Sequence, residues 1–196
     1  MQKRRLFTSA ALAVAALGCG AVPVPQILQS AEAASANTRR IAVVYFTKSG
    51  NTQSLAEAVR AMTGADLYRV ETIEPYPDSY GSATEVVKDE LERGIIRPIK
   101  PFAVNLALYD VIVLATPTWW HHVAMPLQTW IKSVDLSGKQ ILTANTHGGG
   151  GLMETRKDFE TLLAGKNLGT HLTVYGSVRP QDNRVRSWLK ENGCLP

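Results

Sequence analysis

The sequence predicts an α/β fold in which helices cover both faces of a parallel sheet, a doubly wound three-layer sandwich. From Arg40 onward, short continuous apolar runs alternate with segments whose apolar residues recur at helical spacing. Continuous apolar runs are typical of strands that are buried on both faces. Residues 37–196 have room for about five such strand and helix units, which make one domain.

The first half of this region predicts two strands and two helices. The strands are expected at residues 41–46 and 67–70, and the helices at residues 52–62 and 82–93. Gly64 and Gly94 follow the two helices, and glycine is the residue that most readily ends a helix. Pro75 and Pro77 lie in the longer connection that leads to the second helix.

The second half predicts three strands and three helices. The strands are expected at residues 109–115, 140–144 and 171–175, and the helices at residues 126–134, 154–164 and 182–192. Pro117 is expected to end the third strand, because proline cannot donate to a strand ladder. Pro126 suits the first turn of a helix, and Gly193 follows the last helix.

Charge and cysteine content exclude several classes of protein. The chain has 21 basic and 17 acidic side chains without a dense basic block, so nucleic acid is not an expected partner. Cys19 and Cys194 cannot form a CxxC pair or a zinc cluster. Walker A, dinucleotide-binding, serine-hydrolase and zincin motifs are also absent from the sequence.

Residues 1–36 predict an export signal that precedes the folded domain of residues 37–196. Lys3, Arg4 and Arg5 stand before an apolar run of about 13 residues, shorter than the about 20 of a membrane-spanning helix. The adjacent arginines resemble a twin-arginine signal, which carries folded proteins, and a Sec signal is the alternative. We therefore expect cleavage after Ala36, a periplasmic protein, and no stable membrane span after cleavage.

Cys19 supports a minor alternative for this segment. Leu17, Gly18 and Cys19 resemble part of a lipoprotein cleavage box, which would give a lipid anchor at Cys19. Cleavage after Ala36 instead removes three basic residues and Glu32 from a chain of formal charge +4, so the folded domain keeps a charge of only +2.

Three unusual loops are expected at one edge of the sheet, because ligands of open α/β sheets bind beyond the carboxyl ends of the strands. The first loop, residues 47–52, is rich in hydroxyl groups, contains Gly50 and leads into a helix. Backbone N–H groups and the helix dipole at such a start favour a phosphate group. The alternative is an ordinary helix cap, because Ser, Thr and Asn are preferred capping residues.

The second loop, residues 116–122, contains adjacent tryptophans and adjacent histidines. Trp119 and Trp120 cannot both point into one core, so at least one is expected to wall a pocket for a flat ring. Packing of both against the next helix is the alternative. His121 and His122 face opposite ways in an extended chain, and no third ligand stands at a fixed spacing, so we predict no metal site.

The third loop, residues 146–151, contains four consecutive glycines. Glycine lets the backbone approach a ligand closely and present N–H groups to it, which suits the polar edge of a heterocycle. The alternative is a flexible surface loop.

At these three loops the sequence resembles the flavodoxin family, with a TxSGNT phosphate loop, a P-x-W-W segment and a glycine-rich loop. The resemblance covers about residues 40–193 and implies a flavodoxin-like, five-stranded parallel sheet of order 2-1-3-4-5 that binds FMN. The first loop would hold the phosphate, the second would flank the isoalloxazine, and the third would meet the polar edge of the ring. The implied FMN-binding residues are Thr47, Ser49, Gly50, Asn51, Thr52, Thr116, Pro117, Thr118, Trp119, Trp120, Thr146, His147, Gly148, Gly149 and Gly150.

The expected function is that of an exported FMN-dependent oxidoreductase, with quinones or similar molecules as acceptors. None of the three loops contains Asp or Glu, so an anionic reduced flavin should be repelled less than in the acidic flavodoxins. One alternative is a pure electron carrier that docks a redox partner and has no substrate, and another is a flavin-binding module without turnover. The catalytic residues and the electron donor stay open, and an exported protein has little access to NAD(P)H.

Overall fold

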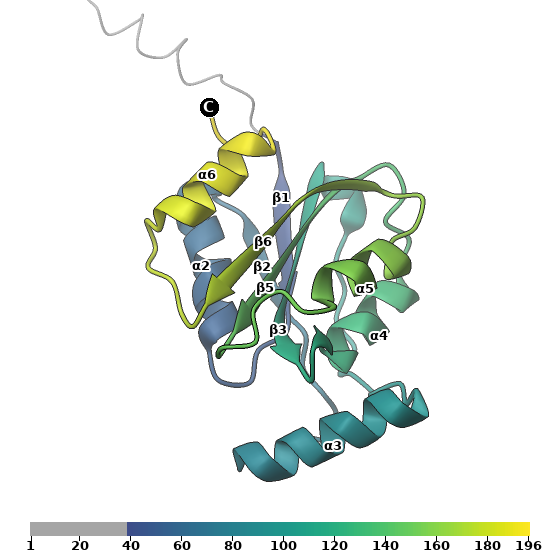
Figure 1. Ribbon diagram of the computed structural model, residues 1–196. Coiled ribbons are helices and arrows are strands. Elements are labelled where there is room, and N and C mark those ends of the chain that lie inside the picture. Colours follow the sequence, from purple (N-terminus) through teal and green to yellow (C-terminus); the bar gives the residue numbers. More distant parts are fainter. Residues whose placement is uncertain (1–38) are drawn as a thin grey trace, which may run out of the picture. The chain divides into compact units, whose positions relative to one another are not determined.

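The computed structural model describes residues 39–196, and the predicted export signal lies outside these residues (Figure 1). The five parallel strands lie in the order β2-β1-β3-β5-β6, and a short strand, β4, pairs antiparallel with β3. Counted among parallel strands alone, this is the order 2-1-3-4-5, so the predicted fold class is confirmed. No helix in residues 39–196 is both long enough and apolar enough to cross a membrane.

Each predicted strand and helix is present, with shifted ends. The strands are β1 (Ile41–Tyr45), β2 (Asp66–Arg69), β3 (Val111–Trp119), β4 (His122–Val123), β5 (Gln140–His147) and β6 (Asn167–Tyr175). The helices are α2 (Asn51–Thr63), α3 (Tyr80–Arg93), α4 (Met125–Ser133), α5 (Thr155–Leu162) and α6 (Asn183–Glu191), and Leu106–Leu108 forms a 3-10 turn.

Two hydrophobic cores lie on opposite faces of the sheet, because successive strand side chains point to opposite sides. Ile41, Val43 and Tyr45 of β1 belong to the core that α2 and α6 cover. Ala42 and Val44 belong to the core that α4 and α5 cover. Figure 1 shows these helix pairs on the two sides of the sheet, and every residue of β1 is buried, as the continuous apolar run predicts.

Helix α3 lies beyond the end of the sheet at which β3 and β5 terminate (Figure 1). Its buried Glu90 accepts hydrogen bonds from the Tyr76 hydroxyl (2.6 Å) and from the Arg97 guanidinium (2.8 Å). The Arg97 guanidinium also lies 4.2 Å from the centre of the Tyr76 ring. A buried carboxylate is stable only when it is paired in this way, so these bonds anchor α3 at the carboxyl edge.

The prediction that Pro117 ends the third strand is wrong, because β3 continues to Trp119 and then turns back as β4. Val111 N–H donates to Arg40 on the β1 side, so every second residue of β3, including Pro117, directs its nitrogen to that side. At Pro117 strand β1 has already ended, since its last pair is Tyr45 with Ala115. The missing N–H therefore costs no ladder bond.

Two further strands are longer than predicted. Strand β5 runs to His147 instead of residue 144, and β6 begins at Asn167 instead of residue 171. The β5 extension is polar throughout, and the β6 extension has a single apolar residue, Leu168, so neither continues the apolar pattern. Residues of both extensions nevertheless pair between β5 and β6, with one register shift between Ile141 and Thr143.

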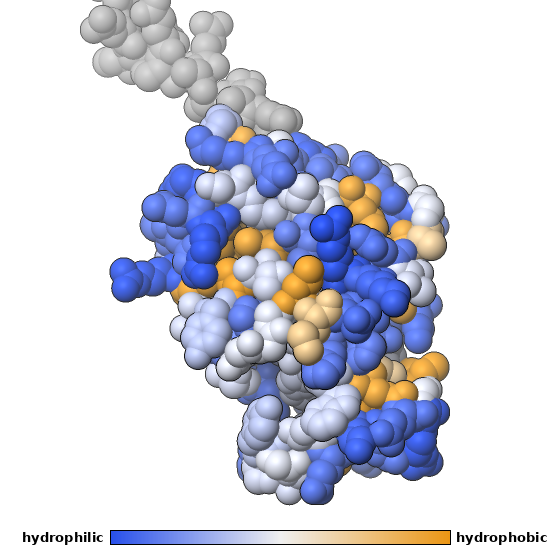
Figure 2. Space-filling model, in the orientation of Figure 1, coloured by the Kyte–Doolittle hydropathy of each residue, from blue (hydrophilic) through white to orange (hydrophobic). Residues whose placement is uncertain are grey.

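The face of the molecule in Figure 2 is largely hydrophilic, with apolar side chains in small separate patches.

Candidate functional site

The structure brings the three predicted loops together at the carboxyl edge of the sheet. The hydroxyl groups of Thr52, in the first loop, and Thr146, in the third, lie 2.8 Å apart and are buried. The Thr118 hydroxyl of the second loop donates to the Gly151 carbonyl of the third, at 3.3 Å. Each loop therefore touches another, and the predicted site residues form one region.

The first loop leaves backbone N–H groups free at the start of α2. Gly50 occupies the N-cap position with a φ of 90°, and no side chain in the described part of the chain caps the helix. The first helical hydrogen bond runs from Ser54 N–H to the Gly50 carbonyl, so the N–H groups of residues 51–53 precede it. The side-chain cap that the alternative requires is thus missing from residues 39–196, and the loop fits an anion such as a phosphate group.

Several predicted residues support the site from inside the protein. The Thr47 hydroxyl accepts a hydrogen bond from Gly50 N–H (3.1 Å) and is nearly buried. The Thr116 hydroxyl is fully buried, accepts from Ala124 N–H (3.0 Å) and donates to the Pro117 carbonyl (2.9 Å). These threonines shape the loops, whereas Ser49 is exposed.

The two tryptophans have different environments. The Trp119 ring packs edge-on against Phe46, with centroids 5.1 Å apart, and against Tyr76, with centroids 4.7 Å apart. The Trp120 side chain is 46% exposed, and the Lys88 ammonium of α3 lies 5.9 Å from the centre of its ring. Trp119 is therefore part of an aromatic cluster, and Trp120 is the ring that is open to a ligand.

The turn between β3 and β4 is strained. Trp120 and His121 have φ values of 46° and 76°, so both central residues of this two-residue turn lie in the left-handed region. Such turns favour Asn and Gly, because side chains with a Cβ cost about 1–2 kcal/mol in this conformation. Strained residues are often found at binding sites, where the surrounding structure holds them in place.

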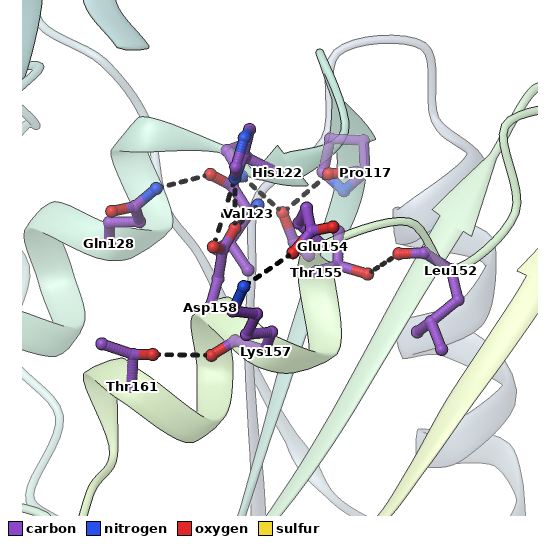
Figure 3. Close-up of polar contacts among 12 residues, drawn as sticks. Pro117, His122, Val123, Gln128, Leu152, Glu154, Thr155, Lys157, Asp158 and Thr161 are labelled. Carbon is purple, nitrogen blue, oxygen red and sulfur yellow. Dashed lines mark hydrogen bonds and ion pairs between the residues drawn. The ribbon is translucent and has the colours of Figure 1, made fainter. Parts of the chain in front are cut away.

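A carboxylate from α5 holds this hairpin (Figure 3). Asp158 accepts hydrogen bonds from Val123 N–H (2.9 Å) and from the His122 Nδ1 (3.0 Å), and Gln128 donates to the Val123 carbonyl (2.8 Å). His121 instead stacks on Trp120. The adjacent histidines thus have different partners, and residues 39–196 contain no group of three or more candidate metal ligands.

The glycine loop has open space beside its backbone. A Cβ atom added at Gly148, Gly149 or Gly151 would meet no atom within 4 Å, and Gly151 has a φ of 74° that only glycine adopts readily. His147 Nδ1 accepts from Gly149 N–H (3.2 Å), so this side chain supports the start of the loop. The open space is compatible with the close approach of a ligand.

The sequence did not reveal two residues that hydrogen-bond to the loops from the protein interior, Asn145 and Asp158. The strand predicted at residues 140–144 stops before Asn145, yet Asn145 is fully buried in β5 and its amide contacts Thr118 and Gly151. The available signal was the alternation of polar residues at 143, 145 and 147, which all lie on one face of β5. Asp158 has no such signal, since it lies 35 residues from Val123.

A separate polar depression of about 680 Å³ opens at the opposite, amino edge of the sheet. Its charged groups are bonded within the protein, since Lys139 donates to the Tyr109 carbonyl (2.7 Å) and Asp110 accepts from Arg40 N–H (2.9 Å). It contains none of the predicted site residues. The carboxyl edge, with its free helix start and accessible aromatic ring, is therefore the better candidate site.

Comparisons with known proteins agree with this architecture. The sequence model of the flavodoxin family matches residues 40–192, whereas no curated protein matches the chain. Candidate flavoproteins from Bacteroides eggerthii DSM 20697 and Bacteroides uniformis ATCC 8492 have identities of 24% and 23%. Each covers 78% of this chain, over 96% and 98% of its own length, with a TM-score of 0.67.

A third similar structure is a flavoprotein in complex with FMN from Lactobacillus acidophilus NCFM. It is 17% identical, covers 76% of this chain and 98% of its own, and has a TM-score of 0.64. At these identities the likeness to solved structures establishes the fold.

Proposed function

The chain belongs to the flavodoxin family, and on this basis we propose that it is an exported FMN-dependent oxidoreductase that reduces quinones or similar acceptors. The cofactor is FMN, which supplies the redox chemistry, while the protein binds it and adjusts its potential. The electron donor is a separate molecule or protein.

One observation carries the proposal: the uncapped start of α2 and the accessible Trp120 both lie at the carboxyl edge of the sheet. The N–H groups of residues 51–53 suit a single phosphate group, and Trp120 offers a flat surface to an aromatic ring. FMN combines these two chemical features. The first loop offers one such helix start, and the sequence has no dinucleotide fingerprint, so FMN fits better than FAD.

The charges near this edge support an acceptor such as a quinone. The three loops have no Asp or Glu, and Lys88 lies against the Trp120 ring. Positive charge stabilises the anionic reduced flavin and raises its midpoint potential. A flavin of raised potential suits a quinone, which takes up two electrons and two protons to form a hydroquinone.

The electron-carrier alternative also has a specific observation in its favour. Glu154 N–H donates to the His121 carbonyl (3.0 Å), which brings the exposed side chains of Leu152 and Met153 beside the hairpin that carries Trp120. Exposed apolar side chains around a redox centre suit a docked partner protein. Turnover on a small acceptor decides between the two functions.

The cofactor and the acceptor can be tested on the purified protein. We expect it to be yellow and to release FMN, identified by mass spectrometry, and a colourless protein that ignores added FMN would contradict the cofactor. After reduction with one equivalent of dithionite, mixing with a soluble naphthoquinone in a stopped-flow instrument should reoxidise the flavin within seconds. Reoxidation only by a partner protein would favour the carrier.

Export can be tested through Arg4 and Arg5. Twin-arginine recognition depends on the guanidinium pair and not only on charge. Replacement of both by lysine should therefore block export of the folded protein, measured by cell fractionation, while a Sec signal would tolerate the change. Unchanged export of the double variant would refute the twin-arginine assignment.

A further inference from the structure

The amide of Asn145 lies at the centre of a buried hydrogen-bond network. It is fully buried and makes four side-chain hydrogen bonds, which is the full capacity of a primary amide. Its partners are the Thr118 hydroxyl (2.6 Å), the Gly151 carbonyl (3.2 Å), His171 Nε2 (2.8 Å) and the Thr173 hydroxyl (2.8 Å). The amide therefore joins β3, the glycine loop and β6.

The direction of each hydrogen bond follows from the Gly151 carbonyl, which can only accept. The Asn145 nitrogen must face this carbonyl, so the Asn145 oxygen faces His171 and Thr173. His171 then donates from Nε2, and its Nδ1 accepts from the Thr143 hydroxyl at 2.8 Å. The chain of donors runs from Thr143 through His171 and Asn145 to Gly151.

This chain pins the carboxyl-terminal end of the glycine loop. The Gly151 carbonyl also accepts from the Thr118 hydroxyl, and the other end of the loop is held where Gly176 N–H donates to the His147 carbonyl (2.9 Å). Glycine has the largest backbone freedom of any residue, so four consecutive glycines are otherwise costly to order. If the loop is already ordered in the apoprotein, ligand binding does not have to overcome the entropic cost of ordering it.

We propose that Asn145, oriented by His171, is a positioning residue that holds the glycine loop in the conformation that receives the flavin. This inference rests on the proposed FMN-binding function. Its site lies on the α5 side of the sheet, where neighbouring strand positions carry apolar core residues. A fully satisfied polar network in such a place specifies one arrangement of the groups that it joins.

Asn192 provides a matched control. It is also a largely buried asparagine that bonds to β6, but at the opposite edge of the sheet: it accepts from Thr170 N–H (3.0 Å) and donates to the Thr170 hydroxyl (2.8 Å) and the Trp188 carbonyl (2.7 Å). Loss of either amide should lower stability. Only loss of the Asn145 amide should affect the glycine loop.

The experiment compares FMN binding to the apoproteins of Asn145→Ala and Asn192→Ala by fluorescence titration, at a temperature where circular dichroism shows both folded. We expect Asn145→Ala to weaken FMN binding at least tenfold, and Asn192→Ala to change it less than twofold. Equal affinities in the two variants would overturn the inference and leave FMN binding by the unchanged protein intact. Failure of the unchanged protein to bind FMN would instead overturn the proposed function and this inference with it.

A second pair of variants covers the case in which Asn145→Ala does not fold. Gln at position 171 can still donate to Asn145 and accept from Thr143, whereas Leu can do neither. His171→Gln should keep FMN affinity within threefold, and His171→Leu should lose at least tenfold. In nuclear magnetic resonance spectra of the apoproteins, the amide signals of Gly148–Gly151 should broaden only in the Leu variant. Equal affinities and equal spectra would overturn the inference.

Discussion

At the scale of single residues, the two adjacent tryptophans illustrate what a sequence pattern can and cannot decide. The pattern shows that both rings cannot enter one core, but it does not show which ring does. Tertiary contacts decide this, because Tyr76 and Phe46 lie 43 and 73 residues before Trp119 in the sequence. The accessible ring, Trp120, is recognised only when the hairpin of β3 and β4 is seen.

Alanine substitutions should therefore separate the two rings. Trp119→Ala removes two edge-on aromatic contacts and should lower the free energy of unfolding of the apoprotein by about 2–4 kcal/mol. Trp120→Ala removes a 46% exposed ring and should cost less than about 1 kcal/mol, but it should weaken FMN binding. Urea denaturation and FMN titration measure the two effects. The reverse assignment of these effects would show that Trp119 is the ring that contacts the cofactor.

His171 should make stability depend on pH. Burial, followed by the positive charge of Arg156, lowers its pKa from 6.5 to about 4, while Glu160 acts in the opposite direction. Between pH 6.5 and pH 4 the unfolded chain binds a proton at His171 that the folded protein does not bind. The contribution of neutral His171 to the free energy of unfolding is therefore fully present above about pH 6.5 and is lost as the pH falls towards 4. The expected loss is about 2–3 kcal/mol.

The measurement is urea denaturation at pH 4.5 and pH 7.5 for the unchanged protein and for His171→Gln. Glutamine does not titrate, so the variant should lose less stability on acidification. An identical loss in both proteins would mean that His171 titrates normally in the folded state.

At the scale of elements, the start of α2 combines two opposing electrostatic effects. A negative side chain in the first turn of a helix stabilises the helix by about 0.3–1 kcal/mol. The same charge repels a bound phosphate group. Asn51 is the first residue of α2, and the first turn of α2 contains no acidic residue. This is expected if the start of the helix binds an anionic ligand.

Asn51→Asp should therefore raise the stability of the apoprotein slightly and weaken FMN binding at least tenfold. Loss of one charge-assisted contact corresponds to about 1.5–3 kcal/mol, and added repulsion acts in the same direction. Thermal unfolding of the apoprotein and FMN titration give the two values. A gain in stability with unchanged FMN affinity would return this helix start to the role of an ordinary cap.

Most elements could be predicted because the burial of each strand or helix leaves its own period in the sequence. The errors occur where polar residues are buried or where proline is tolerated by its neighbours. Pro117 lies in β3 because β1 has ended beside it, and Asn145 lies in β5 because His171 and Thr173 satisfy its amide. Both explanations depend on residues far away in sequence, so no local pattern contains them.

At the scale of the whole molecule, strand order explains why three distant loops form one site. The loops after β1, β3 and β5 belong to neighbouring parallel strands, so their carboxyl ends meet at one edge. This much could be predicted from the order of elements. The position of α3 beyond the same edge could not, because it depends on the buried bonds among Tyr76, Glu90 and Arg97.

Helix α3 changes the charge at this edge, and this leads to a prediction for the flavin potential. The three loops have no carboxylate, and α3 adds Lys88 against Trp120, although Glu92 lies 3.6 Å from the Lys88 ammonium. We expect the midpoint potential of the bound flavin at pH 7 to lie above those of acidic flavodoxins. Positive charge stabilises the anionic reduced form more than the neutral oxidised form.

Reversal of one charge tests this argument directly. Lys88→Glu should lower the midpoint potential by about 20 mV or more, since about 1 kcal/mol of lost attraction corresponds to roughly 20 mV for a two-electron couple. Lys132→Glu, an exposed charge reversal on α4, should leave the potential unchanged and serves as the control. Equilibration with reference dyes measures both. If the unchanged protein has a midpoint potential as low as those of acidic flavodoxins and reduces no quinone, the charge at this edge does not set the midpoint potential of the flavin. The electron-carrier function then becomes the better account of the molecule.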